Sequence, residues 1–401
     1  FRNDPDPFRK LRIGFVSGDF RSHSVGFFLK PLFDCYDQQQ LEIHCYAEVE
    51  SPDETTHRFR QSVCGWYSSV GRDAATVAER IRADRIDILI DLAGYTAHNR
   101  LDIFALRPAP VQITWLGYPG TTGSPVINYR ITDAIADPPG ESDNWHSERL
   151  LRLPNGFLCY EPPEEAPAVA TAPIIRNGYV TFGSFNTLSK LNSQVIETWA
   201  TLLHRVPGAR LLLKCKQLAD SDTCQRLHEQ FADLGVSTYR IRLMAKVEGT
   251  KGHLAMYHEV DIGLDPFPYN GTTTTCEALW MGVPVVTLCG DRHSGRVGSS
   301  VMMRLGLESL VARDETDYVK RAEALALDRQ RLTHLRQTLR QRMMGSPLCD
   351  GSAFARVFEG VLRKVWIDWC RNPILAKAKE GWLIRVHSRD AVDMEGINLV
   401  R

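Results

Sequence analysis

The segment Leu11-Arg12-Ile13-Gly14-Phe15-Val16-Ser17-Gly18-Asp19 decides the fold class. Its apolar run predicts a buried strand, and the small residues at its end predict a sharp turn. The residues that follow favour a helix over 26–36 and a second strand over 41–46. A strand, a helix and a strand in this order predict a βαβ unit, and hence a parallel sheet.

The same alternation continues through the first half of the chain. Residues 74–85 have helical spacing, and Ile86-Asp87-Ile88-Leu89-Ile90-Asp91-Leu92 is a nearly continuous apolar run, typical of a strand buried on both faces. Another strand is expected over 111–116, followed by the loop Gly117-Tyr118-Pro119-Gly120-Thr121-Thr122-Gly123. These elements predict a first α/β domain with helices on both faces of its sheet.

A change of composition between residues 161 and 173 predicts a domain boundary. This stretch is rich in Pro and Ala and poor in periodic apolar residues, as linkers are. We therefore expect an N-terminal Rossmann-like domain over 1–160, a linker over 161–175, and a C-terminal Rossmann-like domain with C-terminal helices over 176–401. Because doubly wound sheets bind ligands at the carboxyl ends of their strands, a ligand crevice is expected between the two domains.

The second half repeats the alternation of strands and helices. Strands are expected over 179–183, 210–214, 261–264 and 283–288. Helices are expected over 192–203, 221–234, 274–281, 298–305 and most of 315–345.

Composition and charge exclude several classes of protein. The 401 residues carry 48 Lys and Arg against 48 Asp and Glu, so the formal net charge is zero. A balanced chain is not expected to bind nucleic acid as its main activity. No run of about 18 uncharged apolar residues occurs, so no membrane span is predicted.

The termini and the cysteines indicate the cellular setting that we expect. The ten cysteines show no CxxC and no regular spacing, which favours free thiols in a reducing compartment, and hence the cytoplasm. The first residues have no signal-peptide pattern and no starting Met, so we expect a fragment or a processed form.

The strongest functional motif is Asp265-Pro266-Phe267-Pro268-Tyr269-Asn270-Gly271-Thr272-Thr273-Thr274-Thr275-Cys276-Glu277-Ala278-Leu279-Trp280. A strand leads into a turn of Gly and four Thr that opens a helix. The N–H groups and the dipole at a helix N-terminus favour anions, and the threonine hydroxyls add donors, so a diphosphate site is expected. The alternative is an ordinary helix cap, a role for which Thr is well suited. Glu277 either accepts from a sugar hydroxyl or only complements the helix dipole.

Three further side chains follow predicted strands. Lys190, after strand 179–183, is expected to neutralise a leaving pyrophosphate, although most lysines are simply solvated surface groups. His23, after the first strand, is a candidate general base, and His98 is a weaker one, although most histidines are structural.

No metal site is predicted. The sequence has no HExxH, no DxD at a strand end and no Cys/His cluster with ligand spacing. It also has no GxSxG, P-loop or GxGxxG, and the last absence counts against an oxidoreductase.

Taken together, several stretches resemble the catalytic region of the nucleocytoplasmic protein O-glycosyltransferases, the O-GlcNAc transferases and the SPINDLY-type proteins. The resemblance extends from Leu11 to about Trp366. The stretches that carry it are Gly14-Phe15-Val16-Ser17-Gly18-Asp19-Phe20, Ala105-Leu106-Arg107-Pro108-Ala109-Pro110-Val111-Gln112, Trp115-Leu116-Gly117-Tyr118-Pro119-Gly120-Thr121-Thr122-Gly123, Phe185-Asn186 with Lys190, and the run from Asn270 to Thr275.

The resemblance implies a GT-B fold, with two Rossmann-like domains facing across a crevice. It implies an inverting, metal-independent transfer of one GlcNAc from UDP-GlcNAc to Ser or Thr of a protein, without a cofactor. The residues it implies on the donor are Lys190 at the diphosphate, Thr273 and Thr274 at the phosphates, Glu277 at the ribose, His253 at the base, and Thr187, Gly271 and Thr272 nearby. Those it implies on the acceptor or sugar side are His23 as a proposed base and the loop residues Tyr118, Pro119, Gly120 and Thr121.

The chain departs from the animal O-GlcNAc transferases at two of these positions. Thr272 replaces a His and Thr187 replaces a Gln. The run Gly271-Thr272-Thr273-Thr274-Thr275-Cys276-Glu277 is closer to SPINDLY-type and many bacterial members. SPINDLY-type proteins use GDP-fucose, so protein O-fucosylation is the alternative activity. The family's acceptor-binding tetratricopeptide repeats and the insert of the animal enzymes are absent from this sequence, and we expect that repeats precede it in the full protein. An enzyme with a glycan or lipid acceptor and a non-catalytic sugar-nucleotide-binding module also fit the sequence.

Overall fold

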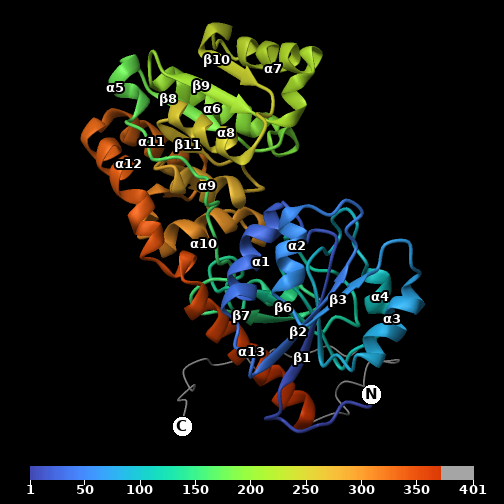
Figure 1. Ribbon diagram of the computed structural model, residues 1–401. Helices are drawn as coiled ribbons and strands as arrows, with labels where there is room; N and C mark the ends of the chain where they lie inside the picture. Colours follow the sequence, from blue (N-terminus) through green and yellow to red (C-terminus); the bar gives the residue numbers. More distant parts are fainter. Residues whose placement is uncertain (372–401) are drawn as a thin grey trace. The chain divides into compact units, whose positions relative to one another are not determined.

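The computed structural model describes residues 1–371, which form two compact units (Figure 1). The first unit comprises Phe1–Phe157 together with residues 352–371, and the second comprises Leu158–Gly351. Part of the expected C-terminal domain, residues 372–401, lies outside the described residues.

The first unit is built on a parallel sheet of seven strands in the order β3-β2-β1-β4-β5-β6-β7. The strands are β1 (Leu11–Ser17), β2 (Leu41–Ala47), β3 (Gly65–Ser68), β4 (Ile88–Asp91), β5 (Val111–Thr114), β6 (Tyr129–Thr132) and β7 (Arg149–Arg152). The helices are α1 (Ser24–Cys35), α2 (Glu54–Gln61), α3 (Ala74–Ala83), α4 (Leu101–Ala105), the short η1 (Asp143–Trp145) and α13 (Gly351–Arg371).

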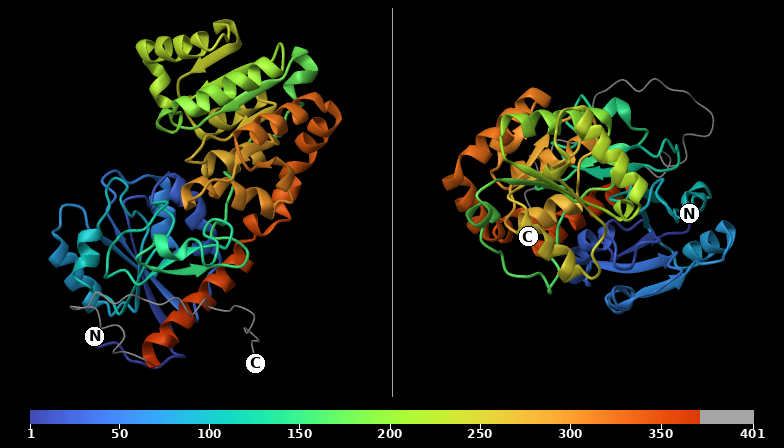
Figure 2. Two further views of the ribbon diagram at one scale, coloured as in Figure 1. Left: turned by 180° about the vertical axis from the view of Figure 1, so that it is seen from behind. Right: turned by 90° about the horizontal axis from the view of Figure 1, so that it is seen from above.

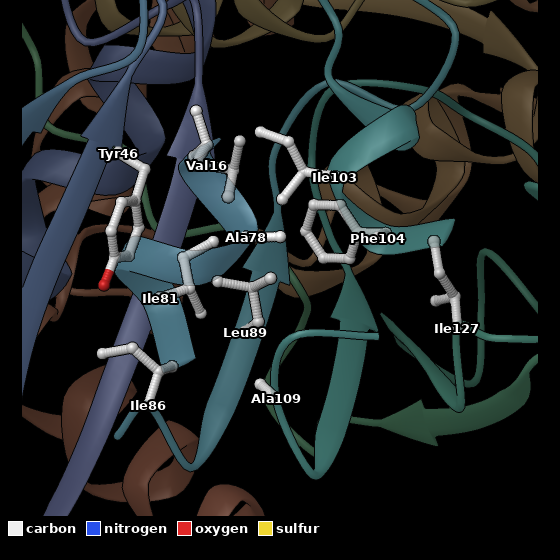
Figure 3. Packing of buried hydrophobic residues seen from close by; sticks show 11 residues of the cluster. Val16, Tyr46, Ala78, Ile81, Ile86, Leu89, Ile103, Phe104, Ala109 and Ile127 are labelled. Carbon is white, nitrogen blue, oxygen red and sulfur yellow. The ribbon is translucent and has the colours of Figure 1, made fainter. Parts of the chain in front are cut away.

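Helices cover both faces of this sheet because neighbouring residues of β1 point in opposite directions. Val16 packs on one face, in a buried cluster with residues of α3 and α4 such as Ile81 and Phe104 (Figure 3). The ring of Phe15 packs on the other face against Phe33 of α1, with 5.2 Å between ring centroids. The first unit is therefore doubly wound, as the strand–helix alternation predicts.

Helix α13 packs on the first unit, which differs from the domain division expected from the sequence. The ring of Trp115, after β5, lies 5.9 Å from that of Phe354 and 4.9 Å from that of Phe358. At the other end of the helix, Trp366 Nε1 donates to the carbonyl of Asp6 at 3.0 Å. Figures 1 and 2 show α13, in red, along the N-terminal sheet. The chain thus returns to its first unit after completing the second.

The second unit is built on a parallel sheet of six strands in the order β10-β9-β8-β11-β12-β13. The strands are β8 (Thr181–Ser184), β9 (Arg210–Lys214), β10 (Ile241–Met244), β11 (Ile262–Leu264), β12 (Val285–Leu288) and β13 (Val311–Ala312). The helices are α5 (Pro173–Asn177), α6 (Ser193–Arg205), α7 (Ser221–Asp233), α8 (Thr250–Ala255), α9 (Thr273–Trp280), α10 (Val297–Arg304), α11 (Glu315–Leu327) and α12 (Arg329–Met344). The short helices are η2 (Leu188–Lys190), η3 (Lys216–Ala219), η4 (Thr238–Arg240), η5 (Met256–Glu259), η6 (His293–Gly295), η7 (Glu308–Leu310) and η8 (Pro347–Cys349).

The proline-rich stretch that the sequence predicts as a linker lies against helix α12 of the second unit. Arg336 Nε donates to the carbonyl of Ala170 at 2.9 Å, and Arg340 Nη2 donates to that of Pro167 at 2.7 Å. Because the stretch has few apolar side chains to bury, these guanidinium groups hold its backbone in place.

Candidate functional site

The N-terminus of α9 carries unpaired N–H groups. Thr272 is the N-cap, but its hydroxyl makes no capping hydrogen bond. Within residues 1–371, no hydrogen bond is recorded from the backbone N–H groups of Thr273, Thr274 or Thr275. Three donors at the positive end of a helix form an anion-binding surface. The geometry therefore favours the anion site over an ordinary threonine cap.

Gly271 shapes this turn by leaving space. Its N–H points inward and donates to Asp265 Oδ1 at 2.6 Å, so it is not directed at a ligand. A Cβ at Gly271 would lie 2.5 Å from Thr274 Oγ1 and 2.9 Å from Thr275 Oγ1. Only glycine fits this position without displacing these hydroxyl groups.

The buried carboxylate of Asp265 stabilises the turn by accepting the hydrogen bond from the Gly271 N–H. It is buried at the end of β11, and its second carboxylate oxygen accepts from Thr287 Oγ1 at 2.7 Å. Burial raises the pKa of Asp265 to about 7, while the hydrogen bonds from Thr287 and Gly271 and the charge of Lys190 oppose that rise.

Asn186, after β8, links the neighbouring strand to α9. Its Oδ1 accepts from Thr274 Oγ1 at 3.2 Å. A small pocket at this point is lined by Phe185, Asn186, Asp265, Thr274 and Thr275, among others. The carboxyl ends of β8 and β11 thus meet the N-terminus of α9, where ligands bind in sheets of this type.

Lys190 reaches the same turn from η2. Its Nζ donates to the carbonyl of Asn270 at 2.7 Å and lies 3.9 Å from the ring centroid of Tyr269. Burial lowers the pKa of Lys190 to about 8, and the charge of Asp265 opposes that shift. At neutral pH the ammonium group is charged and has three hydrogens, of which one is used by Asn270. It is therefore suited to bind an oxyanion beside α9.

Glu277 and His253 form a second polar group next to the first. Glu277 is buried on α9, and its Oε2 lies 2.9 Å from His253 Nε2. Tyr257 donates its hydroxyl to the carbonyl of Thr274 at 3.1 Å and contacts Glu277 Oε2 at 3.3 Å. Lys214, at the end of β9, completes the row with its Nζ 2.5 Å from His253 Nδ1.

The structure thus brings together most of the donor-side residues expected from the sequence: Lys190, Gly271, Thr272, Thr273, Thr274, Glu277 and His253. Thr187 lies beside η2, where its hydroxyl accepts from Gln217 Nε2 at 3.0 Å and lies 3.3 Å from Ser189 Oγ. The contacts recorded for Thr187 are therefore with η2 and η3 rather than with α9.

Four members of this site have no role in the sequence prediction: Lys214, Asn186, Asp265 and Tyr257. Of these, Asp265 and Asn186 lie in stretches that the sequence analysis quotes. The rule that identifies Lys190 is that polar residues near the carboxyl end of a parallel strand are candidates for the site. It applies equally to Lys214, the last residue of β9, and to Asn186 and Asp265, which follow β8 and β11. The sequence holds no comparable signal for Tyr257, because its position depends on the packing of η5 against α9.

His23, in the first unit, is the N-cap of α1. Its Nδ1 lies 3.3 Å from the N–H of Val25 and 3.4 Å from Asp19 Oδ2. Burial lowers the pKa of His23, which Asp19 opposes and Arg21 reinforces. The ring is therefore favoured in its neutral form at pH 7, as a general base requires. His98 has a positive φ of 58° and lies 3.8 Å from Glu50 Oε1.

The loop with Tyr118, Pro119, Gly120 and Thr121 is held by its own unit. Arg130 Nη1 donates to the carbonyl of Gly120 at 2.7 Å, and Thr121 Oγ1 donates to Glu148 Oε2 at 2.7 Å. The ring of Tyr118 meets Tyr95 edge-on, with 5.4 Å between centroids. This loop is polar, with its hydrogen bonds directed inward.

Two other kinds of site are not found within the described part of the chain. No three or more His, Cys, Asp or Glu residues among 1–371 are arranged to hold a metal ion. None of the helices in that range has the length and apolar character needed to cross a membrane. The ten cysteines are all free.

Comparisons with known proteins connect this geometry to one family. The chain is 45% identical, over 376 residues, to a tomato (Solanum lycopersicum) protein named probable UDP-N-acetylglucosamine–peptide N-acetylglucosaminyltransferase SPINDLY. The match covers 93% of this chain, which spans only 40% of the length of that relative.

Solved structures give the same result for the fold. The structure of a mutant of Thermobaculum terrenum O-GlcNAc transferase superimposes with a TM-score of 0.88 at 40% identity, covering 92% of this chain and 70% of that one. Sucrose-phosphate synthase from Thermosynechococcus elongatus, at 14% identity and a TM-score of 0.56, covers 90% of this chain and 100% of that one, and shares the fold alone. The two parallel-sheet α/β units are those of the GT-B fold. Since residues 2–166 and 168–358 also match the model of glycosyl transferase family 41, this chain belongs to that family.

Proposed function

We propose that this chain is the catalytic region of a protein O-glycosyltransferase that transfers a single GlcNAc from UDP-GlcNAc to Ser or Thr hydroxyls. The observation that carries the proposal is that Lys190, which donates to the carbonyl of Asn270, and the N–H groups at the start of α9, for which no partner is recorded within residues 1–371, belong to the same turn. Together these groups provide positive charge where a nucleotide diphosphate would leave. The names of the relatives support UDP-GlcNAc as donor and a peptide as acceptor.

The proposed reaction is a direct displacement with inversion. The acceptor hydroxyl oxygen bonds to the anomeric carbon while the bond from that carbon to the diphosphate oxygen breaks. The electron pair leaves with the diphosphate, whose growing charge is stabilised by Lys190 and by the N–H groups of Thr273 and Thr274. Because these groups supply the positive charge, we propose that the transfer needs no metal ion.

The hydroxyl proton is proposed to go to His23. For Nε2 to accept a proton, Nδ1 must carry the other one, and Asp19 Oδ2 is the acceptor that favours this tautomer. The N–H of Val25 donates to the same Nδ1, and this hydrogen bond requires an unprotonated Nδ1. The role of His23 as helix cap therefore competes with its role as base. A His23→Ala variant is expected to lose about 10²-fold or more in kcat and to lose the acidic limb of the pH–rate profile. An unchanged rate with an unchanged profile would remove His23 from the role of base.

The donor is tested by calorimetry of the full chain with UDP and with GDP. Tighter binding of UDP, followed by transfer from UDP-GlcNAc to polypeptide, supports the proposal. Tighter binding of GDP would favour the alternative, a SPINDLY-type protein O-fucosyltransferase that uses GDP-fucose. The threonine run Thr272-Thr273-Thr274-Thr275 is the feature that favours this alternative.

Acceptor class is tested with the same preparation. Label from the donor sugar is expected on protein Ser or Thr. Label found only on glycans or lipids would change the acceptor class. Binding of the donor without transfer or hydrolysis, in the presence of acceptor proteins, would identify a non-catalytic binding module.

A further inference from the structure

Lys214 is a buried cation at the inner end of the polar row that leads to α9. Its side chain is on the last residue of β9, and the residue is only 2% exposed. Its Nζ lies 2.5 Å from His253 Nδ1 and 4.5 Å from the ring centroid of Phe185. Burying an ammonium group is unfavourable unless charge or hydrogen bonds compensate, so the contact with His253 needs an explanation.

The chemistry of the row fixes where the His253 proton lies. An ammonium group only donates hydrogen bonds, so the Nδ1 that faces Lys214 must be the unprotonated nitrogen. The proton of the neutral ring is then on Nε2, which lies 2.9 Å from Glu277 Oε2 and donates to it. Lys214 thus determines that His253 presents a donor, not an acceptor, to Glu277.

The contacts of Glu277 show how the donor on His253 orients its carboxylate. Its Oε2 receives His253 and, at 3.3 Å, the hydroxyl of Tyr257. Both contacts recorded for this carboxylate within residues 1–371 are with the same oxygen, so the carboxylate is held in one orientation. Oε1 is then the oxygen left to accept a hydrogen bond from a ligand. Burial lowers the pKa of Lys214 to about 8, and the negative charge of Glu277 opposes that shift.

We infer that Lys214 is a positioning residue for the nucleoside half of the donor: through His253 it holds Glu277 as an oriented acceptor for a sugar hydroxyl. The inference rests on the proposed function, since it assumes a nucleotide donor at α9. The diphosphate half depends on a different cation, Lys190, which contacts Asn270 and not His253. The two lysines therefore serve separate parts of one ligand.

The test is calorimetry of the full chain at pH 7 with UDP, GDP and inorganic pyrophosphate. Lys214→Met, which keeps the length of the side chain, is expected to weaken the preferred nucleoside diphosphate about tenfold and to change pyrophosphate binding less than twofold. Lys190→Ala is expected to weaken pyrophosphate about tenfold or more. Lys214→Arg retains a cationic donor and is expected to restore most of the nucleotide affinity.

The experiment distinguishes failure of the positioning role of Lys214 from failure of the proposed function. If Lys214→Met weakens pyrophosphate as much as the nucleotide, or leaves nucleotide binding unchanged, the positioning role is overturned while the proposed function stands. If the wild type binds neither nucleotides nor pyrophosphate, the proposed function and the inference are both overturned.

A measurement on the wild type tests the inference even if the Met variant does not fold. The ¹⁵N shifts of His253 are expected to show an unprotonated Nδ1 and a protonated Nε2 at pH 7. A proton on Nδ1 of the neutral ring would overturn the inference.

Discussion

Two loops in this molecule follow the carboxyl end of a parallel strand, yet they use their polar groups in opposite ways. In the first unit, the loop after β5 directs its polar groups inward: Thr122 donates both its N–H, at 2.7 Å, and its hydroxyl to Glu148 Oε1. In the second unit, the turn after β11 directs two backbone donors inward: the N–H of Gly271 bonds to Asp265, and the N–H of Asn270 bonds to the carbonyl of Ser294 at 2.9 Å. The N–H groups that follow it at the start of α9 have no recorded partner within residues 1–371.

The difference separates a loop that completes its own structure from one that needs a ligand. In the first loop a buried carboxylate accepts the available donors, so an added anion would have to compete with Glu148. In the second, the carboxylate of Asp265 lies below the turn and accepts from its backbone, while the ammonium group of Lys190 lies beside it. Binding capacity therefore depends on which donors are left after the loop has folded, and four predictions test this contrast.

The largest expected effect is that of Lys190→Ala. Removing one preformed donor to a developing anion commonly lowers kcat by about 10²–10³-fold. We expect a loss of this size in transfer from the sugar nucleotide, with the melting temperature nearly unchanged because the side chain is half-buried.

Two variants control this experiment. Lys190→Arg keeps the charge and should retain much more activity than the alanine variant. Lys320→Ala removes an exposed lysine from α11 and should leave kcat unchanged. Near-normal turnover of the Lys190→Ala variant would show that the turn after β11 does not stabilise the leaving group.

Gly271→Ala should have the next largest effect. The added Cβ would lie 2.5 Å from Thr274 Oγ1 and 2.9 Å from Thr275 Oγ1, so these hydroxyl groups must move. Overpacking of this kind costs about 1–3 kcal/mol, and we expect affinity for pyrophosphate to fall about tenfold. Gly345→Ala is the matched control, because its Cβ would meet only the Gln341 carbonyl at 3.6 Å. Equal affinity of the two variants would mean that the site tolerates the displacement of these hydroxyl groups.

Much of this contrast could be predicted from the sequence. Local apolar runs identify the strands β1, β4, β9 and β11, because a strand that is buried on both faces has consecutive apolar residues. The anion-binding turn is likewise predictable, since its chemistry lies in one continuous stretch of Gly and Thr. Both follow from rules that need only neighbouring residues.

Features that depend on distant partners could not be predicted. Strand β6 contains Arg130, a residue type that is usually exposed, and it is buried because its guanidinium reaches the carbonyl of Gly120. The prediction from the sequence assigns helix α13 to the second domain, because its place in the first unit depends on contacts with distant residues such as Trp115 and Asp6. The role of Lys214 requires knowing that α8 brings His253 to the end of β9.

The pH dependence of pyrophosphate binding is expected to be a smaller effect. Since burial lowers the pKa of Lys190 to about 8, its ammonium charge is present below pH 8 and is lost as the pH rises through that value. Affinity should therefore fall above pH 8, by up to about tenfold per pH unit. The ligand also titrates, so the comparison is with Lys190→Arg, which stays charged throughout. Equal profiles for the two proteins would contradict the assignment.

The smallest effect on donor binding is expected from Glu148→Gln, because this residue completes the loop of the first unit. Hydrogen bonds from Thr122 and Thr121 lower the pKa of Glu148 against the opposing effect of burial, so the group is charged at neutral pH. Glutamine has one acceptor oxygen where the carboxylate has two, so at least one threonine donor loses its partner. We expect stability to fall by about 1–3 kcal/mol at pH 7, while UDP or GDP affinity changes less than twofold.

The sign of the pH effect distinguishes this explanation from simple misfolding. A carboxyl group whose folded pKa is depressed stabilises the protein above its unfolded pKa, and that contribution is lost as the pH falls through the folded value. The stability difference between wild type and Glu148→Gln should therefore shrink as the pH is lowered, as measured by urea unfolding of each protein from pH 7 downward. A difference that stays constant, or a large loss of nucleotide affinity in this variant, would mean that the loop after β5 is not the self-contained structure that distinguishes it from the turn after β11.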